Sequence, residues 1–162
     1  MAVLGSSIEP NNAHVVRVVE AAAKALGLQH LYLDLQDAND IETAFRAAGK
    51  ERAGAVILLS NSILTSQRRQ IIDLAVKSRL PVSYARPEFV ESGGLMTYGV
   101  SMTDLYRRAA SYIDKILKGT KPADIPVEQP KKFEFIINLK AAKQIGLTIP
   151  PNVLARADKV IK

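Results

Sequence analysis

AGAVILLSNS, residues 53–62, is a nearly continuous apolar run that ends in three small polar residues. A strand that is covered by helices on both faces needs apolar side chains at successive positions, so the run predicts a central parallel strand over residues 53–59. Asn61 and Ser62 follow directly and favour the start of a helix that continues to about residue 79. This stretch therefore predicts one strand–helix unit of an α/β domain.

The same alternation of strand and helix patterns extends on both sides of this unit. Further strands are expected at residues 2–4, 30–35, 81–84 and 95–98, with helical patterns between them. Gly27 is expected to end the first helix, and Asn39 with Glu42 predicts a capping box for the second. Successive strand–helix units favour a doubly wound parallel sheet with right-handed crossovers.

The pattern changes after a helix expected at residues 101–118, which Ser101 caps. Residues 119–132 contain three prolines and predict an extended connection. Residues 133–137 alternate like a strand, Asn138 caps a short helix that Gly146 ends, and residues 150–151 open a last helical turn that includes Val160. We expect this C-terminal strand–helix extension to leave the main sheet or to join another one.

Composition excludes several classes of function. The chain has 162 residues, a net charge of +6 and no cysteine, so disulfides and thiol chemistry are absent. Its basic residues occur singly or in pairs without interleaved aromatic residues, which favours solvated surfaces over nucleic-acid binding. No nucleophile–base pair, dinucleotide fingerprint or set of metal ligands occurs, so we predict no catalytic residue, no metal site and no cofactor.

Candidate binding residues follow the strands, because ligands of open α/β sheets bind outside the carboxyl ends of the strands. Hydroxyls, amides and one guanidinium at this edge suit a small polar or anionic group, and Arg86 can bind a carboxylate through two nitrogens. Two alternatives stay open: serine and asparagine also cap helices, and Arg86 can pair with Glu88 or Glu91. Aromatic contacts can come from Tyr84, Phe89 or Tyr98, for which core packing is the default. The predicted ligand-binding residues are Ser6, Ser7, Asn61, Ser62, Ala85, Arg86 and Glu88.

Three stretches carry a specific resemblance: AVLGSSIEPNN (residues 2–12), residues 87–130 and residues 132–161, of which GTKPADIPVEQP (residues 119–130) is the most distinctive. They resemble the ABC-transporter substrate-binding protein family, in the members of type I periplasmic-binding fold related to tryptophan- and tyrosine-binding lipoproteins. The resemblance implies a Rossmann-like or flavodoxin-like lobe of a clamshell that holds an amino acid or similar organic acid. Residues 1–97 would form the second lobe, and residues 98–162 would cross to the first lobe and finish the hinge.

The family resemblance also implies a membrane permease as partner and a periplasmic or lipid-anchored extracytoplasmic location. The signal peptide and most of the first lobe that the family places before residue 2 are not in this sequence. We therefore expect a truncated form, which would be cytoplasmic if this chain is the full product. The helix at residues 101–118 would then expose an apolar face, and a homodimer could cover it. The alternative function is a ligand-sensing or dimerising domain that does not take part in transport.

Overall fold

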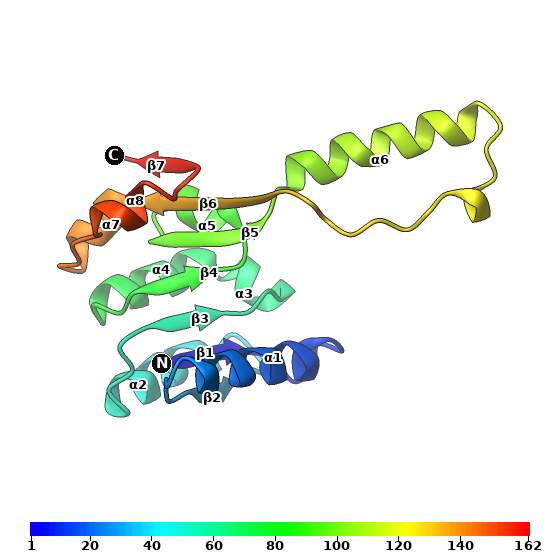
Figure 1. Ribbon diagram of the computed structural model, residues 1–162. Helices are drawn as coiled ribbons and strands as arrows, with labels where there is room; N and C mark the ends of the chain where they lie inside the picture. The colour runs from blue at the N-terminus through cyan, green and yellow to red at the C-terminus, as the bar shows by residue number, and fades with distance from the viewer.

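The computed structural model describes residues 1–162 and contains one seven-stranded sheet (Figure 1). Its order is β2-β1-β3-β4-β5-β6-β7, in which β1 to β5 are parallel, β6 is antiparallel to β5, and β7 is parallel to β6. The predicted α/β class with a doubly wound parallel sheet is confirmed. The strands are β1 (Ala2–Gly5), β2 (Leu31–Asp34), β3 (Val56–Leu58), β4 (Val82–Tyr84), β5 (Met96–Val100), β6 (Phe133–Asn138) and β7 (Lys159–Ile161).

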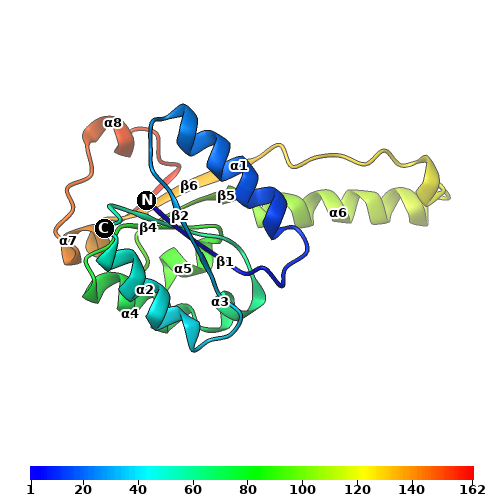
Figure 2. The same cartoon turned by 90° about the horizontal axis from the view of Figure 1, so that it is seen from below.

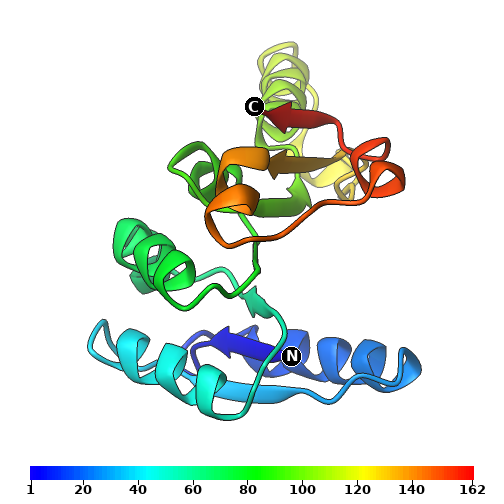
Figure 3. The ribbon, with the colours of Figure 1, turned by 90° about the vertical axis from the view of Figure 1, so that its left-hand side faces the viewer.

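Helices cover the sheet from both sides. Helices α2, α4 and α5 lie together on one face, and α1 lies on the other (Figure 2; Figure 3 shows the strands one above another, from the blue β1 and β2 at the bottom to the red β7 at the top). The chain steps in one direction from β1 to β2 and in the other from β3 to β5, so the direction of winding changes between β1 and β3. The helices are α1 (Asn12–Ala25), α2 (Asp40–Lys50), α3 (Ser62–Ser66), α4 (Arg68–Lys77), α5 (Pro87–Glu91), α6 (Met102–Leu117), α7 (Leu139–Gln144) and α8 (Pro151–Leu154), with a 3₁₀ turn η1 (Pro122–Asp124).

The main core lies between the sheet and helices α2, α4 and α5. It is one cluster of 19 buried residues, which includes Leu4 and Leu58 from the strands and Phe45 and Ile71 from the helices. Tyr84 stacks on the ring of Phe89 with centroids 4.7 Å apart. Each fully buried side chain of this size contributes about 1.5–3 kcal/mol, so this face fixes the frame on which the strand ends are held.

Three of the four predicted side-chain caps are present. Asn61 Oδ1 accepts from the Leu64 amide at 2.6 Å, Ser101 Oγ from that of Asp104 at 3.4 Å, and Asn138 Oδ1 from that of Ala141 at 3.1 Å. The prediction for Asn39 is wrong, because its side chain caps nothing. Asp40 Oδ2 instead accepts from the Gln36 and Asp37 amides and secures the turn before α2.

The remaining differences concern element boundaries and the tail. The helix expected to run to residue 79 is divided at Gln67 into α3 and α4. Val160 lies in strand β7, not in a helical turn, because it pairs in parallel with Ile137. The expected departure of the tail from the main sheet is wrong as well: β6 pairs with β5 over five residues and extends the same sheet.

Helix α6 projects from the sheet as an arm, and residues 118–132 return alongside it (Figure 1). None of its residues is buried; Tyr106, Ile113 and Leu117 are 70%, 57% and 82% exposed. The two ends of the arm are hydrogen-bonded to each other where the chain leaves and re-enters the sheet. There the Ser101 amide donates to the Lys132 carbonyl at 3.0 Å, and Ser101 Oγ donates to Glu134 at 2.6 Å. None of the helices has the length and apolar content needed to cross a membrane.

Candidate functional site

A cavity of about 360 Å³ opens at the carboxyl edge of the parallel strands. The start of α1 supplies Asn11, Asn12 and Val15 to its wall, and the rest comes from Glu9, the ends of β3 and β4, and Tyr98 of β5. The change in winding between β1 and β3 separates the helices here, which is where open α/β sheets place their ligands. The volume lies in the range of small-molecule sites.

The cavity has an apolar part and a polar part. Val15, Ile57 and Leu59 form apolar wall, while amides and hydroxyls come from Asn11, Asn12, Ser60 and Ser83. Glu9 adds a carboxylate. A wall of this kind suits a small molecule with an apolar body and a charged or polar end.

Tyr98 presents an aromatic ring at the cavity although it belongs to a strand. Its side chain is 64% exposed, and its ring stacks on Phe133 with centroids 5.8 Å apart and meets Phe135 edge-on at 6.2 Å. Tyr98 and Phe135 are direct partners in the antiparallel β5–β6 pair. The three rings therefore hold one another in place without being buried.

A chain of hydrogen bonds connects the first turn to the edge strand. Asp34 accepts from the Ser7 amide at 2.7 Å, from Ser7 Oγ at 2.7 Å and from the Tyr32 hydroxyl at 3.1 Å. Asn12 Nδ2 in turn donates to the Tyr32 oxygen at 2.8 Å. The bond from Ser7 Oγ is the main reason that the pKa of Asp34 is lowered, whereas burial raises the pKa of Tyr32.

Gly5 allows Asn12 to approach the sheet. A Cβ at this position would lie 2.5 Å from Asn12 Oδ1, 3.0 Å from Leu59 Cδ1 and 3.2 Å from Tyr32 Cε2. The first of these distances is too short for a real Cβ and the other two are tight, so the glycine provides the space in which the Asn12 amide sits.

Of the seven predicted binding residues, only Ala85 lines this cavity. Ser6 and Asn61 are buried at the ends of the neighbouring strands β1 and β3, and Ser6 Oγ and Asn61 Nδ2 have no hydrogen-bond partner in the protein. Ser7 is exposed and bonded to Asp34, and Ser62 is the exposed first residue of α3. The capping alternative holds for Asn61, which leaves its amide nitrogen free of any protein partner.

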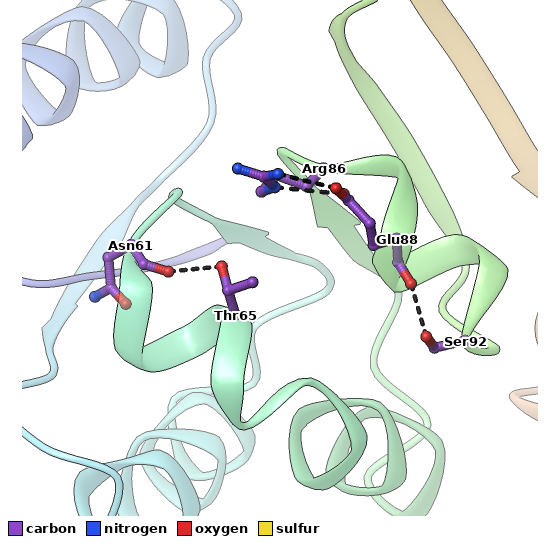
Figure 4. A network of polar contacts seen from close by, with 5 residues as sticks. All are labelled: Asn61, Thr65, Arg86, Glu88 and Ser92. Atoms are coloured by element: carbon purple, nitrogen blue, oxygen red, sulfur yellow. Dashed lines mark hydrogen bonds and ion pairs between the residues drawn. The ribbon is translucent and has the colours of Figure 1, made fainter. Parts of the chain in front are cut away.

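Arg86 and Glu88 form the local ion pair that was the alternative to ligand binding (Figure 4). The guanidinium donates to both carboxylate oxygens, at 2.9 and 3.3 Å. Arg86 is the main reason that the pKa of Glu88 is lowered. Figure 4 shows this pair at the start of α5 and Asn61, whose carbonyl accepts from Thr65, at the start of α3.

Sequence reasoning missed Glu9, Asn11 and Asn12, and it gave Tyr98 a core position by default. The two asparagines belong to the turn that follows β1, but only the geometry of that turn shows that they reach the cavity. The sequence signal that could have indicated these residues was Pro10, which lies between the two serines and the start of α1. Of the other two aromatic candidates, Phe89 is a core residue, and Tyr84 is a core residue that also lines the cavity.

The chain matches the family described as ABC transporter substrate binding protein over residues 1–161. Two solved structures are similar over nearly all of it. A conserved domain protein from Vibrio cholerae has 26% sequence identity and a TM-score of 0.87, and the match covers 98% of this chain and 53% of that one. An ABC domain in complex with L-Trp from Streptococcus pneumoniae has 29% identity and a TM-score of 0.86, and the match covers 99% of this chain and 54% of that one. An uncharacterized protein of Rickettsia prowazekii is 29% identical over 107 residues, which are 66% of this chain and 35% of that protein. The chain thus spans about half the length of the solved structures and about a third of the curated relative.

Proposed function

Because the chain belongs to the ABC transporter substrate-binding protein family, we propose that it binds a small organic solute as a component of an ABC-type importer. The observation that carries the proposal is the cavity at the carboxyl edge of the sheet, in which apolar wall from Val15, Ile57 and Leu59 faces amide and hydroxyl groups. A membrane permease would be the partner that receives the solute.

The proposed ligand is an amino acid or a similar organic acid. Glu9 can accept from an ammonium group, while the side-chain amide of Asn11 can donate to a carboxylate. The Tyr98 ring favours a ligand with an apolar or aromatic body. The similar Streptococcus pneumoniae domain is in complex with L-Trp, which makes L-tryptophan the first probe.

We further propose that the sheet, to which residues 1–100 and 133–162 contribute, belongs to one lobe of a clamshell, and that residues 101–132 reach toward a second lobe. The exposed face of α6 supports this division, as does the length of the similar structures, of which the chain covers 53% and 54%. The second lobe would close the open side of the cavity. With one wall only, we expect a dissociation constant of about 1 mM or weaker, because tight sites bury most of the ligand surface.

The test is isothermal titration calorimetry of the chain with L-tryptophan, followed by the other amino acids. We expect Tyr98→Ala to weaken binding about tenfold, because it removes the aromatic wall. Tyr112→Ala on α6, outside the cavity, is the matched control. Ser7→Ala and Asn61→Ala test the residues predicted from sequence. The proposed ligand class is wrong if no amino acid binds the unaltered chain at several millimolar.

A second candidate function, a dimerising or ligand-sensing domain, is favoured by one observation. The apolar side chains of α6 are exposed in a single chain, and a second copy could cover them. Native mass spectrometry separates the two functions, because it detects both a dimer and a retained solute. Ile113→Asp should abolish such a dimer, whereas Ser111→Asp on the polar side of α6 should leave it intact. A ligand-free dimer would favour this second function.

A further inference from the structure

Two side chains outside the cavity, Asp34 and Tyr32, are connected by hydrogen bonds to one side chain of its wall, Asn12. Neither residue contributes to the cavity wall, whereas Asn12, which Tyr32 contacts, does. Asp34 is the last residue of β2, the edge strand, on the far side of β1 from the cavity. Hydrogen bonds between side chains therefore connect this edge to the cavity.

The direction of each hydrogen bond in this chain follows from the charge of Asp34. An ionised carboxylate only accepts, so the Tyr32 hydroxyl must donate its single hydrogen to Asp34 Oδ1 at 3.1 Å. The Tyr32 oxygen is then available only as an acceptor for Asn12, which must present Nδ2 at 2.8 Å. The Asn12 carbonyl oxygen is consequently turned the other way, into the space above Gly5.

The same carboxylate also fixes the turn from which Asn12 emerges. Ser7 donates to Asp34 through both its amide and its hydroxyl, each at 2.7 Å. Hydrogen bonds to an ionised acceptor are about twice as strong as neutral ones. One residue of the edge strand thus holds both the backbone before α1 and, through Tyr32, the amide at the first position of α1.

We propose that Asp34 and Tyr32 are positioning residues for the ligand site, and that they fix the Asn12 amide with Nδ2 toward Tyr32 and Oδ1 over Gly5. The amide oxygen and the Glu9 carboxylate then give this part of the cavity two acceptors. A ligand group that donates hydrogen bonds, such as the ammonium of an amino acid, is the group they recognise. This inference rests on the proposed function, since it assigns the part of the same site that selects the amino group.

Tyr32→Phe tests the proposal, because it removes the hydroxyl and leaves the Ser7–Asp34 bonds in place. We expect the dissociation constant for L-tryptophan to rise about three- to tenfold, as for loss of one hydrogen bond, with the melting temperature nearly unchanged. Tyr112→Phe is the matched control. Asn12→Ala should cost at least as much, and Tyr32→Phe should cost nothing further in the Asn12→Ala background. The proposal would be overturned if Tyr32→Phe bound L-tryptophan with the dissociation constant of the unaltered chain. It would also be overturned if the losses of affinity from Tyr32→Phe and Asn12→Ala were additive in the double variant.

A measurement without ligand separates this inference from the proposed function. In the ¹⁵N-labelled chain, the side-chain amide of Asn12 should give one sharp pair of NMR signals, and Tyr32→Phe should shift or broaden that pair selectively. If the unaltered chain binds no amino acid, the proposed function is wrong, and the NMR signals still decide whether Tyr32 orients Asn12. Unchanged Asn12 signals in Tyr32→Phe would refute the positioning role whatever the chain binds.

Discussion

At the scale of single residues, Gly5 is the position where the sheet and the candidate site constrain each other most closely. We predict that Gly5→Ala destabilises the chain by about 1–3 kcal/mol, because its methyl group overlaps Asn12 Oδ1 and the Leu59 side chain. Gly54→Ala is the matched control, since a Cβ there would have no neighbour within 4 Å. Urea unfolding measures both variants; equal stability of the two would contradict the packing described around Asn12.

Asp34 makes a second residue-scale prediction, on pH. Its pKa is lowered in the folded state, mainly by the bond from Ser7 Oγ, so its contribution to stability is complete above the unfolded pKa of about 3.9 and is lost as the pH falls through the folded value. Because water screens this exposed group, we expect Asp34→Asn to cost about 1 kcal/mol or less at pH 7. The difference from the unaltered chain should shrink toward zero at pH 2.

The control for this pH dependence is Asp73→Asn, a change on the exposed side of α4. Its unfolding free energy should follow that of the unaltered chain at both pH values. A constant penalty for Asp34→Asn from pH 7 to pH 2 would show that the charge of Asp34 is not what secures the turn.

At the scale of elements, Asn138 joins three pieces of the structure. It ends β6, caps α7 through Oδ1, and donates from Nδ2 to the carbonyl of Val90 in α5 at 3.3 Å. We predict that Asn138→Ala costs about 1–3 kcal/mol, because it leaves the buried Ala141 amide without a partner and removes one of the two hydrogen bonds that the Val90 carbonyl accepts. Asn152→Ala, an exposed position in α8, should cost far less. Thermal unfolding compares the two variants, and similar costs would mean that the cap at Asn138 is dispensable.

The sequence predicted the elements whose signals are local. Asn61, Ser101 and Asn138 could be identified as caps because a cap depends on three or four successive residues. The placement of β6 could not be predicted, since its partner β5 is separated from it by the whole α6 arm. Asn39 failed because Asp40, one residue later, makes the competing bonds.

The sequence predicted the edge of the sheet at which the cavity lies, but only part of the set of residues that line it. Strand topology places the carboxyl edge correctly, and Ala85 does line the cavity. Which side chains reach the cavity depends on the face of the sheet toward which each turn leads after its strand. Ser6 ends buried and Ser7 turns to Asp34, while Asn12 turns inward. That choice is set by contacts with Tyr32 and Gly5, which lie far from one another in the sequence.

At the scale of the whole molecule, the sheet and the arm should differ in local stability. No residue of α6 is buried, whereas β3 and β4 contain Val56, Leu58 and Val82 at 3% exposure or less. We predict that backbone amides of α6 exchange hydrogen for deuterium well before those of β3 and β4. Hydrogen-exchange mass spectrometry of the dilute chain measures this. Equal protection at all dilutions would mean that something covers α6 in solution.

The hydrogen bond between Ser101 and Lys132, which joins the two ends of the α6 arm, has a further consequence for how the molecule can be altered. Val100 and Phe133 are paired directly, so the chain departs and returns at neighbouring positions. A tight reverse turn between them would close β5 and β6 into an ordinary hairpin and leave every other strand pairing untouched. The arm is therefore a modular insertion in geometric terms. Evolution or an engineer could lengthen it, shorten it or exchange it without rebuilding the sheet beneath.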